Sequence, residues 1–339
     1  MSASHQSAQG GRTVALPTTE TSLAVALPYW LDRDPNEAME VARAADACGF
    51  EELWIGEMAT FDAFALAGAI ARETSRIGLV IGPLPVTLRD PVALAMGSTS
   101  VSEIGGRPSA LALGASSPTV LSAWHGVETA ASLQAFDDTV TALRQILSGE
   151  RTRYDLANVR SEGFRLRLGL GSPVSLGMAA FGPRMVDLAA EIADRVVLAH
   201  TTPAQIAVVR ERIDRRAAEL GRESPSLSVW MAAAHDEAQV AQVMRGLVAY
   251  IGQPGYRTMF TNAGFGDFVE YARSGVGPKQ VLAAMPIELA DAVAGIGTAE
   301  QIMGRVRACG DAGADQVCIV PATAGDDTAA EVLSSLSPS

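Results

Sequence analysis

The sequence predicts an α/β fold, a (β/α)8 TIM barrel with inserted lid segments, and three observations favour it. Short apolar runs alternate with amphipathic helical patterns along most of the 339 residues. The runs are apolar at consecutive positions, as in parallel strands that are covered on both faces. The unit occurs about eight times, which indicates a closed barrel rather than an open sheet, and 48% hydrophobic residues suffice for one large core.

The first unit is expected to follow an N-terminal tail. Residues 1–21 are mainly Ser, Gln, Gly, Thr and Ala without periodicity, so we expect a disordered tail and then a single domain over residues 22–339. The apolar run 23–28 predicts the first strand. Pro35 marks the start of a helix that Gly49 ends.

Two further units follow at the same spacing. Residues 52–55 predict the second strand and residues 77–81 the third, with a helix at about 63–74 between them. The third strand leads into the pair Gly82-Pro83, and a helix is expected after Pro91.

The fourth unit contains the clearest binding loop. A Gly-Gly turn at 105–106 precedes an apolar run that we interpret as a buried strand. The run ends at small residues, which let a ligand approach the backbone: Gly114, Ala115, Ser116 and Ser117.

The regular alternation is interrupted twice, at about 127–170 and at about 237–294. The first interruption contains an amphipathic helical pattern and then a polar, alternating segment at 151–168, which is typical of a hairpin or a lid. The second contains several short helical patterns. Insertions after barrel strands usually cover the active site, so we interpret both as lid segments.

The remaining units complete the barrel. Apolar runs predict four more strands, at 174–178, 195–198, 227–231 and 316–320. Helical patterns separate them, at about 185–192, 203–220 and 302–309.

Composition and charge argue against several classes of partner. The formal net charge of -12 disfavours nucleic acid or an anionic membrane as the main partner, because both require a basic surface. No apolar stretch reaches the ~18 residues of a membrane-spanning helix, and no signal peptide is recognised, so a cytoplasmic protein is expected. The cysteines Cys48, Cys309 and Cys318 match no zinc spacing, and no metal site is expected.

Active sites of such barrels are built from the loops at the carboxyl ends of the strands. Here those loops contain Glu57, Met58, Gly82, Pro83, Gly114, Ala115, Ser116, Ser117, His125, Ala179, Ala180, Phe181, Gly182, Pro183 and Arg184. The last six suit a phosphate, because small residues that lead into a helix present backbone N–H groups and Arg184 adds a cation. An ordinary tight turn that caps a helix is the alternative.

Three of these residues carry side chains that can take part in catalysis. Glu57 is a candidate acid/base or cofactor ligand, and a structural ion pair explains it equally well. His125 is a candidate proton donor or a packed turn histidine. Ser117 has no His/Asp partner nearby in the sequence, which argues against a serine nucleophile.

The motifs of these loops, taken together, carry a resemblance. They are Leu53-Trp54-Ile55-Gly56-Glu57, Asp62-Ala63-Phe64, Gly105-Gly106-Arg107, Leu113-Gly114-Ala115-Ser116-Ser117-Pro118, Trp124-His125-Gly126, Phe181-Gly182-Pro183-Arg184-Met185 and Glu191-Ile192-Ala193-Asp194. From Leu23 to Ala322 the chain resembles the luciferase-like monooxygenase superfamily, and within it the bacterial oxidoreductases that use the deazaflavin coenzyme F420.

The resemblance implies a TIM barrel with a lid and a cofactor across the barrel mouth. The cofactor ring would lie near Glu57, the Gly82-Pro83 pair and residues 114–117, and its phosphate at residues 179–184. The resemblance also implies a homodimer and a cis peptide bond at Gly82-Pro83, where proline lowers the preference for the trans form.

The implied activity is hydride transfer between coenzyme F420 and a small organic substrate. This chain departs from the family pattern because Met58 stands where many relatives have histidine, Ser117 where some have a catalytic glutamate, and Arg195 where glycine is common. The proton would then come from water, His125 or Ser117. An FMN-dependent monooxygenase is the first alternative, and a non-catalytic barrel that serves as a binding module is the second.

Overall fold

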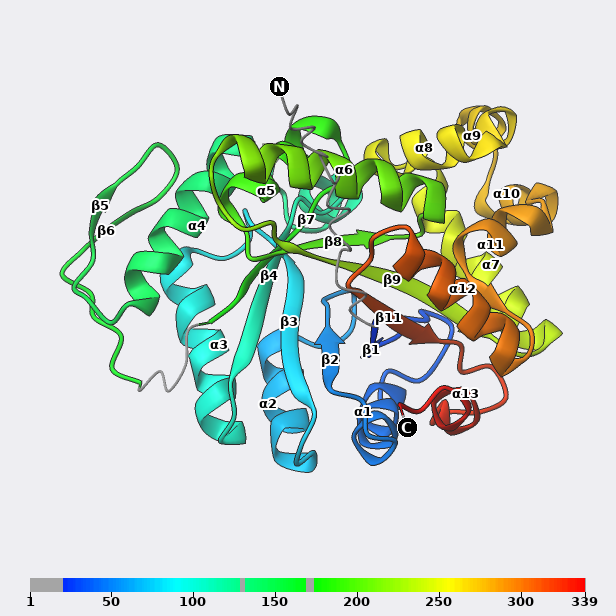
Figure 1. The fold of residues 1–339 in the computed structure, drawn as a ribbon, viewed down its shortest axis with the longest axis horizontal. Coiled ribbons are helices and arrows are strands. Elements are labelled where there is room, and N and C mark those ends of the chain that lie inside the picture. Colours follow the sequence, from blue (N-terminus) through cyan, green and yellow to red (C-terminus); the bar gives the residue numbers. More distant parts are fainter. Residues whose placement is uncertain (1–20, 129–131, 169–173, 339) are drawn as a thin grey trace, which may run out of the picture.

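A computed structural model describes residues 21–128, 132–168 and 174–338. Apart from Thr21, the predicted tail lies outside these residues. Eight parallel strands form a closed barrel in which β1 pairs with β2 and β11, and β8 pairs with β9 (Figure 1). The barrel strands are β1 (Ser22–Ala26), β2 (Glu52–Ile55), β3 (Gly78–Pro85), β4 (Ser109–Gly114), β7 (Leu176–Ala179), β8 (Arg195–Ala199), β9 (Ser226–Ala234) and β11 (Gln316–Pro321).

A helix returns the chain to the amino end of the barrel after each strand, which confirms the predicted (β/α)8 TIM barrel. The ring consists of α1 (Glu37–Ala47), α2 (Ala63–Glu73), α3 (Pro91–Gly105), α4 (Leu133–Leu147), α5 (Pro183–Ile192), α6 (Pro203–Glu219), α12 (Ala299–Asp311) and α13 (Ala330–Ser335). Side-chain oxygens cap several of these helices; Asp62, for example, accepts from the N–H groups of Phe64 and Ala65.

The third strand is longer than the sequence predicts. It continues through the Gly82-Pro83 pair to Pro85, and its register against β4 shifts between Ile81 and Leu84. This bulge bends β3 at the mouth, so the pair lies inside the strand rather than in a turn after it.

The barrel interior holds small side chains and two tryptophans. The rings of Trp54 and Trp230 meet edge to face with their centroids 5.8 Å apart. At the amino end of the barrel, Arg195 donates to Glu52 over 2.7 Å, and Gln316 donates to the same carboxylate over 2.9 Å. Arg195 stands where the family that the sequence resembles commonly has glycine. It therefore takes part in a polar network that fills this end of the barrel.

The segment predicted as the first insertion contains a regular barrel helix. Helix α4 packs against both α3 and α5, and so belongs to the ring. The antiparallel hairpin of β5 (Arg153–Asp155) and β6 (Arg160–Glu162) follows it. The backbone N–H of Asn158 donates to buried Asp138 of α4 over 2.8 Å, which holds the hairpin on the outside of the ring.

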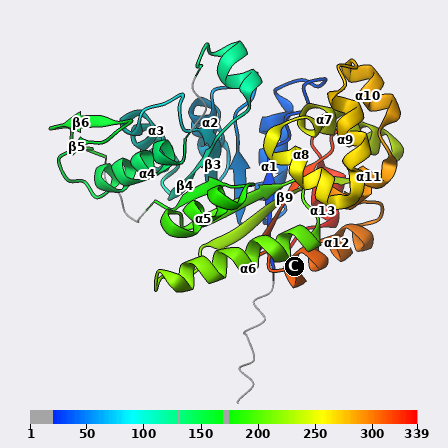
Figure 2. The same cartoon turned by 90° about the horizontal axis from the view of Figure 1, so that it is seen from above.

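The second insertion forms a compact group of helices beside the mouth. It consists of α7 (Glu237–Ile251), α8 (Pro254–Phe260), the π-helix η2 (Thr261–Phe265), α9 (Gly266–Arg273), α10 (Pro278–Ala284) and α11 (Ile287–Val293), followed by β10 (Gly295–Ile296), which pairs with β9. These helices enclose a hydrophobic core of their own around Phe260 and Leu289. Helices α8–α11 and the β5–β6 hairpin lie at opposite ends of the molecule (Figure 2).

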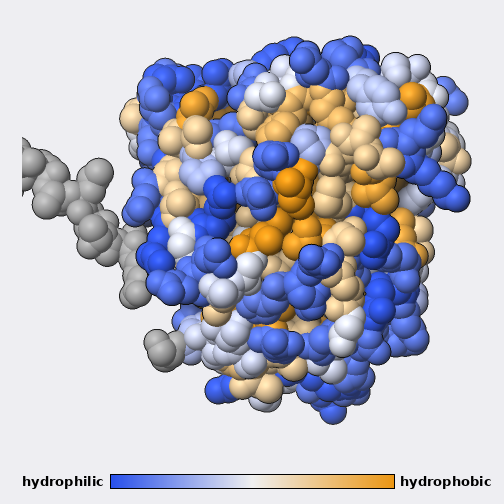
Figure 3. Space-filling view, turned by 90° about the vertical axis from the view of Figure 1, so that its right-hand side faces the viewer, coloured by the Kyte–Doolittle hydropathy of each residue, from blue (hydrophilic) through white to orange (hydrophobic). Residues whose placement is uncertain are grey.

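The face on the side of this helical group exposes some apolar surface. Apolar residues gather in its middle and polar residues surround them (Figure 3).

Within the described ranges, none of the helices has the length and apolar composition needed to cross a bilayer. The same residues contain no group of three or more His, Cys, Asp or Glu side chains arranged to hold a metal ion.

Candidate active site at the barrel mouth

Three of the predicted loops converge on Gly114, the last residue of β4. A Cβ atom at this position would lie 3.2 Å from the Cβ of Pro83 and 3.8 Å from the Cβ of Ala179. The ends of β3, β4 and β7 therefore meet in one small-residue surface, in which Gly114 is buried and Pro83 and Ala179 are partly exposed. A side chain at Gly114 would occupy part of this surface, so glycine keeps it open.

Gly82 has a conformation that only glycine adopts readily. Its φ is +130°, and a Cβ would lie 2.2 Å from the carbonyl oxygen of Ala112. The peptide bond between Gly82 and Pro83 is cis, as expected. Pro83 is partly exposed and forms the edge of the small-residue surface.

The loop after β4 leads directly into a π-helix, η1 (Thr119–Trp124). Ser116 is exposed and left-handed, with φ +61°, and Ala115 before it is partly exposed. The hydroxyl of Ser117 accepts from the N–H of Val120 over 3.3 Å, so it caps the first turn. His125 ends the π-helix and is exposed.

Glu57 forms an ion pair across the rim of the mouth. Both guanidinium Nη atoms of Arg89, from the loop after β3, donate to its two carboxylate oxygens over 2.6 Å. Arg89 also donates to Asp62 over 2.5 Å and lies over the ring of Phe64. These hydrogen bonds, chiefly the one to Glu57, raise the pKa of Arg89. Both carboxylate oxygens of Glu57 are therefore engaged, as expected if Glu57 forms a structural ion pair. Met58, the next residue, is partly exposed.

The loop after β7 leads into α5 with the features of an anion site. Gly182 is the N-cap and provides no side-chain acceptor, and Pro183 occupies the first turn. No side chain of the N-cap residue therefore accepts a hydrogen bond from the first-turn N–H groups of Arg184 and Met185. Gly182, Pro183 and Arg184 are exposed, whereas Ala180 is buried and Phe181 is partly buried.

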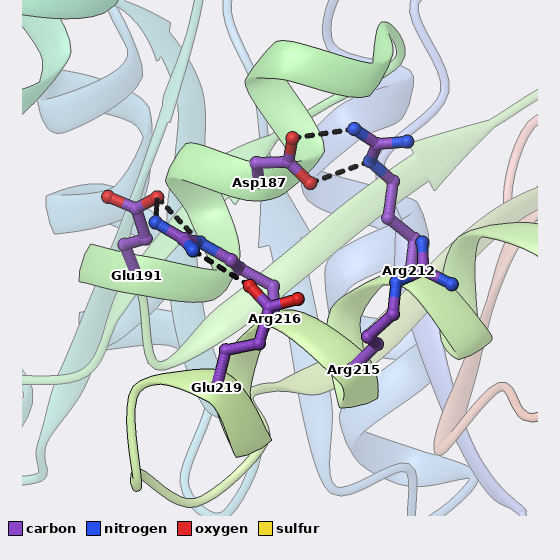
Figure 4. A pocket seen from close by; sticks show the side chains of 6 residues that line it. All are labelled: Asp187, Glu191, Arg212, Arg215, Arg216 and Glu219. Atoms are coloured by element: carbon purple, nitrogen blue, oxygen red, sulfur yellow. Dashed lines mark hydrogen bonds and ion pairs between the residues drawn. The ribbon is translucent and has the colours of Figure 1, made fainter.

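Asp187 does not neutralise Arg184. It forms a two-bonded ion pair with Arg212 of α6, at 2.6 Å for each bond. Among the described residues, Arg184 makes no ion pair within 4 Å. Such pairs line the hollow between α5 and α6 on the outside of the ring, where Arg216 likewise donates to Glu191 and Glu219 (Figure 4).

Aromatic residues that the sequence did not single out lie on the other side of the mouth. His200 directly follows β8, Tyr250 is in the last turn of α7, and Tyr256 is in α8. The ring centroids of His200 and Tyr250 are 4.5 Å apart, and those of Tyr250 and Tyr256 are 4.9 Å apart. Phe181 continues the row 4.6 Å from Tyr256. We call Phe181, His200, Tyr250 and Tyr256 the aromatic wall.

Tyr29 connects the aromatic wall to Glu57. Its hydroxyl donates to the carbonyl oxygen of Gly56 over 2.7 Å, and a Cβ at Gly56 would lie 3.3 Å from the Tyr29 ring and 3.5 Å from Trp230. Burial raises the pKa of Tyr29, and the nearby Glu57 and Tyr250 raise it further. No local pattern distinguishes these aromatic residues from ordinary core residues, because their grouping depends on four separate loops and helices.

Comparisons with known proteins agree with this architecture. The sequence profile described as luciferase-like monooxygenase matches residues 6–316. A Mycobacterium tuberculosis protein with the provisional name coenzyme F420-dependent oxidoreductase is 27% identical over 220 residues, which are 59% of this chain and 61% of that protein. The chain thus spans about three fifths of that relative's length.

Two solved structures show the same fold. The coenzyme F420-dependent tetrahydromethanopterin reductase from Methanopyrus kandleri has a TM-score of 0.77 and 19% identity, and covers 94% of this chain and 98% of its own. The second structure is the oxygenating constituent of 3,6-diketocamphane monooxygenase from Pseudomonas putida in complex with FMN. It has a TM-score of 0.69 and 16% identity, and the match covers 94% of this chain and 96% of that chain.

Proposed function

The chain belongs to the luciferase-like monooxygenase family and is an enzyme of that superfamily; we propose that it transfers a hydride between coenzyme F420 and a small organic substrate. Its fold is shared with a solved F420-dependent reductase, and its curated relative from Mycobacterium tuberculosis carries the name of an F420-dependent oxidoreductase. The observation that carries the proposal is the small-residue surface next to an uncapped helix N-terminus, because the two suit the ring and the phosphate of one cofactor.

The small-residue surface suits a flat ring. Pro83, Gly114 and Ala179 have small side chains or none, so a planar tricycle placed against these strand ends would meet few side-chain atoms. Bound there, the deazaflavin would supply the two-electron hydride chemistry, and the protein would supply orientation and exclusion of water.

The start of α5 fits the phosphate of such a cofactor. The N–H groups of Arg184 and Met185 and the positive end of the helix dipole attract an anion, and the exposed Arg184 adds a full charge. Gly182 lets the phosphate approach the backbone closely, since a Cβ there would meet no atom within 4 Å and the residue is exposed.

The remaining site residues position these groups. Arg89 holds Glu57 in one orientation at the end of β2, which favours a role for Glu57 as a fixed acceptor over one as a mobile acid/base. Ser117 and His125 remain the candidate proton donors, together with water.

Of the two predicted lid segments, 237–294 is the better candidate for a lid, because its helix α8 packs against Phe181 in the phosphate loop.

Titration of the purified protein with F420 and with FMN, under the same conditions, tests the cofactor. We expect saturable binding of F420 and at least ~10-fold weaker binding of FMN. Saturable binding of FMN alone would instead assign the protein to the flavin monooxygenases.

The FMN-dependent monooxygenase is the second candidate, because a solved neighbour with the same fold contains FMN. Stoichiometric consumption of oxygen during turnover would favour it over the F420-dependent reaction. Failure of both cofactors to bind at high concentration would favour a non-catalytic binding module.

A further inference from the structure

The aromatic wall lies at the strand ends rather than in the core. Its four side chains are partly exposed, whereas the neighbouring Ile251 and Phe260 are fully buried. Within the described ranges neither Tyr250 nor Tyr256 has a hydrogen-bond partner for its hydroxyl. Within that part of the chain, neither phenol is committed to another group.

The wall carries no formal charge at neutral pH. Burial lowers the pKa of His200 to about 4, so its imidazole is neutral. Burial also raises the pKa values of Tyr250 and Tyr256, so both phenols stay protonated. The wall therefore presents ring faces, ring edges and neutral O–H donors.

The backbone of His200 supports a role in the site. Its φ is +53°, a left-handed conformation that is uncommon for any residue other than glycine. Such conformations are concentrated at active sites, where the surrounding structure holds them in place. Here the rings of Tyr250 and Tyr256, at centroid distances of 4.5 and 5.6 Å, pack against the imidazole.

Resting on the proposed function, we infer that the aromatic wall forms the substrate side of the active site and selects an uncharged substrate with an aromatic or conjugated ring. Rings stack or meet edge to face with the wall, and a carbonyl or hydroxyl oxygen on such a substrate pairs with a phenol of Tyr250 or Tyr256. A carboxylate would find no cation in the wall, and the nearby Arg89 is already paired with Glu57, so the charge would be left without a partner.

Three small probes test the inference by calorimetry on the F420-loaded protein. Acetophenone has a ring and a carbonyl, cyclohexyl methyl ketone is its saturated analogue, and benzoate has the same ring with a charge. We expect acetophenone to bind about 3- to 10-fold more tightly than either of the other two. Equal binding of all three, absence of binding or tighter binding of benzoate would overturn the inference.

Variants locate the preference in the wall. Tyr250→Leu and Tyr256→Leu should each reduce the preference for acetophenone over its saturated analogue, whereas Tyr256→Phe keeps the ring and should retain it. Tyr271→Leu is the matched control, because Tyr271 is an exposed aromatic residue of α9 outside the wall. A preference that persists in both leucine variants contradicts the inference.

The order of measurements separates the two proposals. If the unaltered protein does not bind F420, the proposed function fails. If it binds F420 but shows no ring preference, only the inference about the substrate fails. Should the leucine variants not fold, the comparison of acetophenone with its saturated analogue on the unaltered protein decides.

Discussion

At the scale of single residues, Arg184 tests the placement of the cofactor phosphate. Asp187, three positions on in α5, is bonded to Arg212 and not to Arg184, so an anion in solution is the best partner for Arg184. A charge-assisted contact contributes ~1.5–3 kcal/mol, so Arg184→Ala should weaken F420 binding by ~10- to 100-fold at low salt.

Two variants serve as controls in this titration. Arg184→Lys should recover only part of the affinity, because lysine is a point charge rather than a fork. Arg215→Ala removes another exposed arginine, on α6, and should leave the affinity unchanged. Normal affinity and unchanged salt dependence in Arg184→Ala would mean that the phosphate binds elsewhere.

His200 makes stability depend on pH. Its pKa is about 4 in the folded protein and 6.5 in the unfolded chain, so the unfolded chain binds more protons between these values. The stability contributed by the neutral imidazole is complete above pH 6.5 and is lost as the pH falls towards 4. The loss is up to ~3 kcal/mol.

Urea unfolding at pH 7 and pH 4.5 measures this contribution. His200→Asn, which tolerates the left-handed backbone, should lose less stability on acidification than the unaltered protein does. His125→Asn, at an exposed position, should behave like the unaltered protein. Equal acid sensitivity of His200→Asn and the unaltered protein would show that His200 is not the responsible group.

At the scale of elements, the bulge in β3 depends on Gly82. An alanine Cβ there would lie 2.2 Å from the carbonyl oxygen of Ala112, so β3 or β4 must move. Gly82→Ala should therefore lower the free energy of unfolding by at least ~3 kcal/mol. At Gly106, with φ +64° and no atom within 4 Å of the added Cβ, alanine should cost only ~1–2 kcal/mol. Similar urea midpoints for the two variants would contradict this account.

At the scale of the whole molecule, the outer side of α2 and α3 is the best candidate for a dimer interface. Met96 and Ile104 of α3 are 49% and 46% exposed, and Phe61 before α2 is 36% exposed. Ile104 lies over Gly68 of α2, so apolar groups of the two helices meet on this side. A stable dimer buries ~800 Å² on each partner, and we expect this side to supply it.

Sedimentation at micromolar concentration tests the dimer. The unaltered protein should sediment as a dimer, and the double variant Met96→Glu, Ile104→Glu as a monomer. Val208→Glu, at a 68% exposed apolar position on α6, should remain a dimer. A monomeric unaltered protein would refute the prediction.

The barrel and most of its element boundaries follow from local sequence patterns. An apolar run that is covered on both faces, or a helix with one apolar side, is recognisable from neighbouring residues alone, because each depends on contacts within a few positions. Strand 52–55 is found where the sequence predicts it, and the predicted phosphate loop does precede a helix. The cis bond at Gly82-Pro83 was expected from the family resemblance, and it is found.

Which of these residues meet depends on the closed barrel and not on local patterns. Glu57 and Arg89 are 32 positions apart, Glu52 and Arg195 are 143 apart, and the aromatic wall combines two strand ends with two inserted helices. Closing the barrel sets these contacts, as it sets the register shift in β3 and the place of α4 in the ring. Local patterns cannot encode them, because the free energy of each contact depends on groups that become neighbours only after the eight strands have closed.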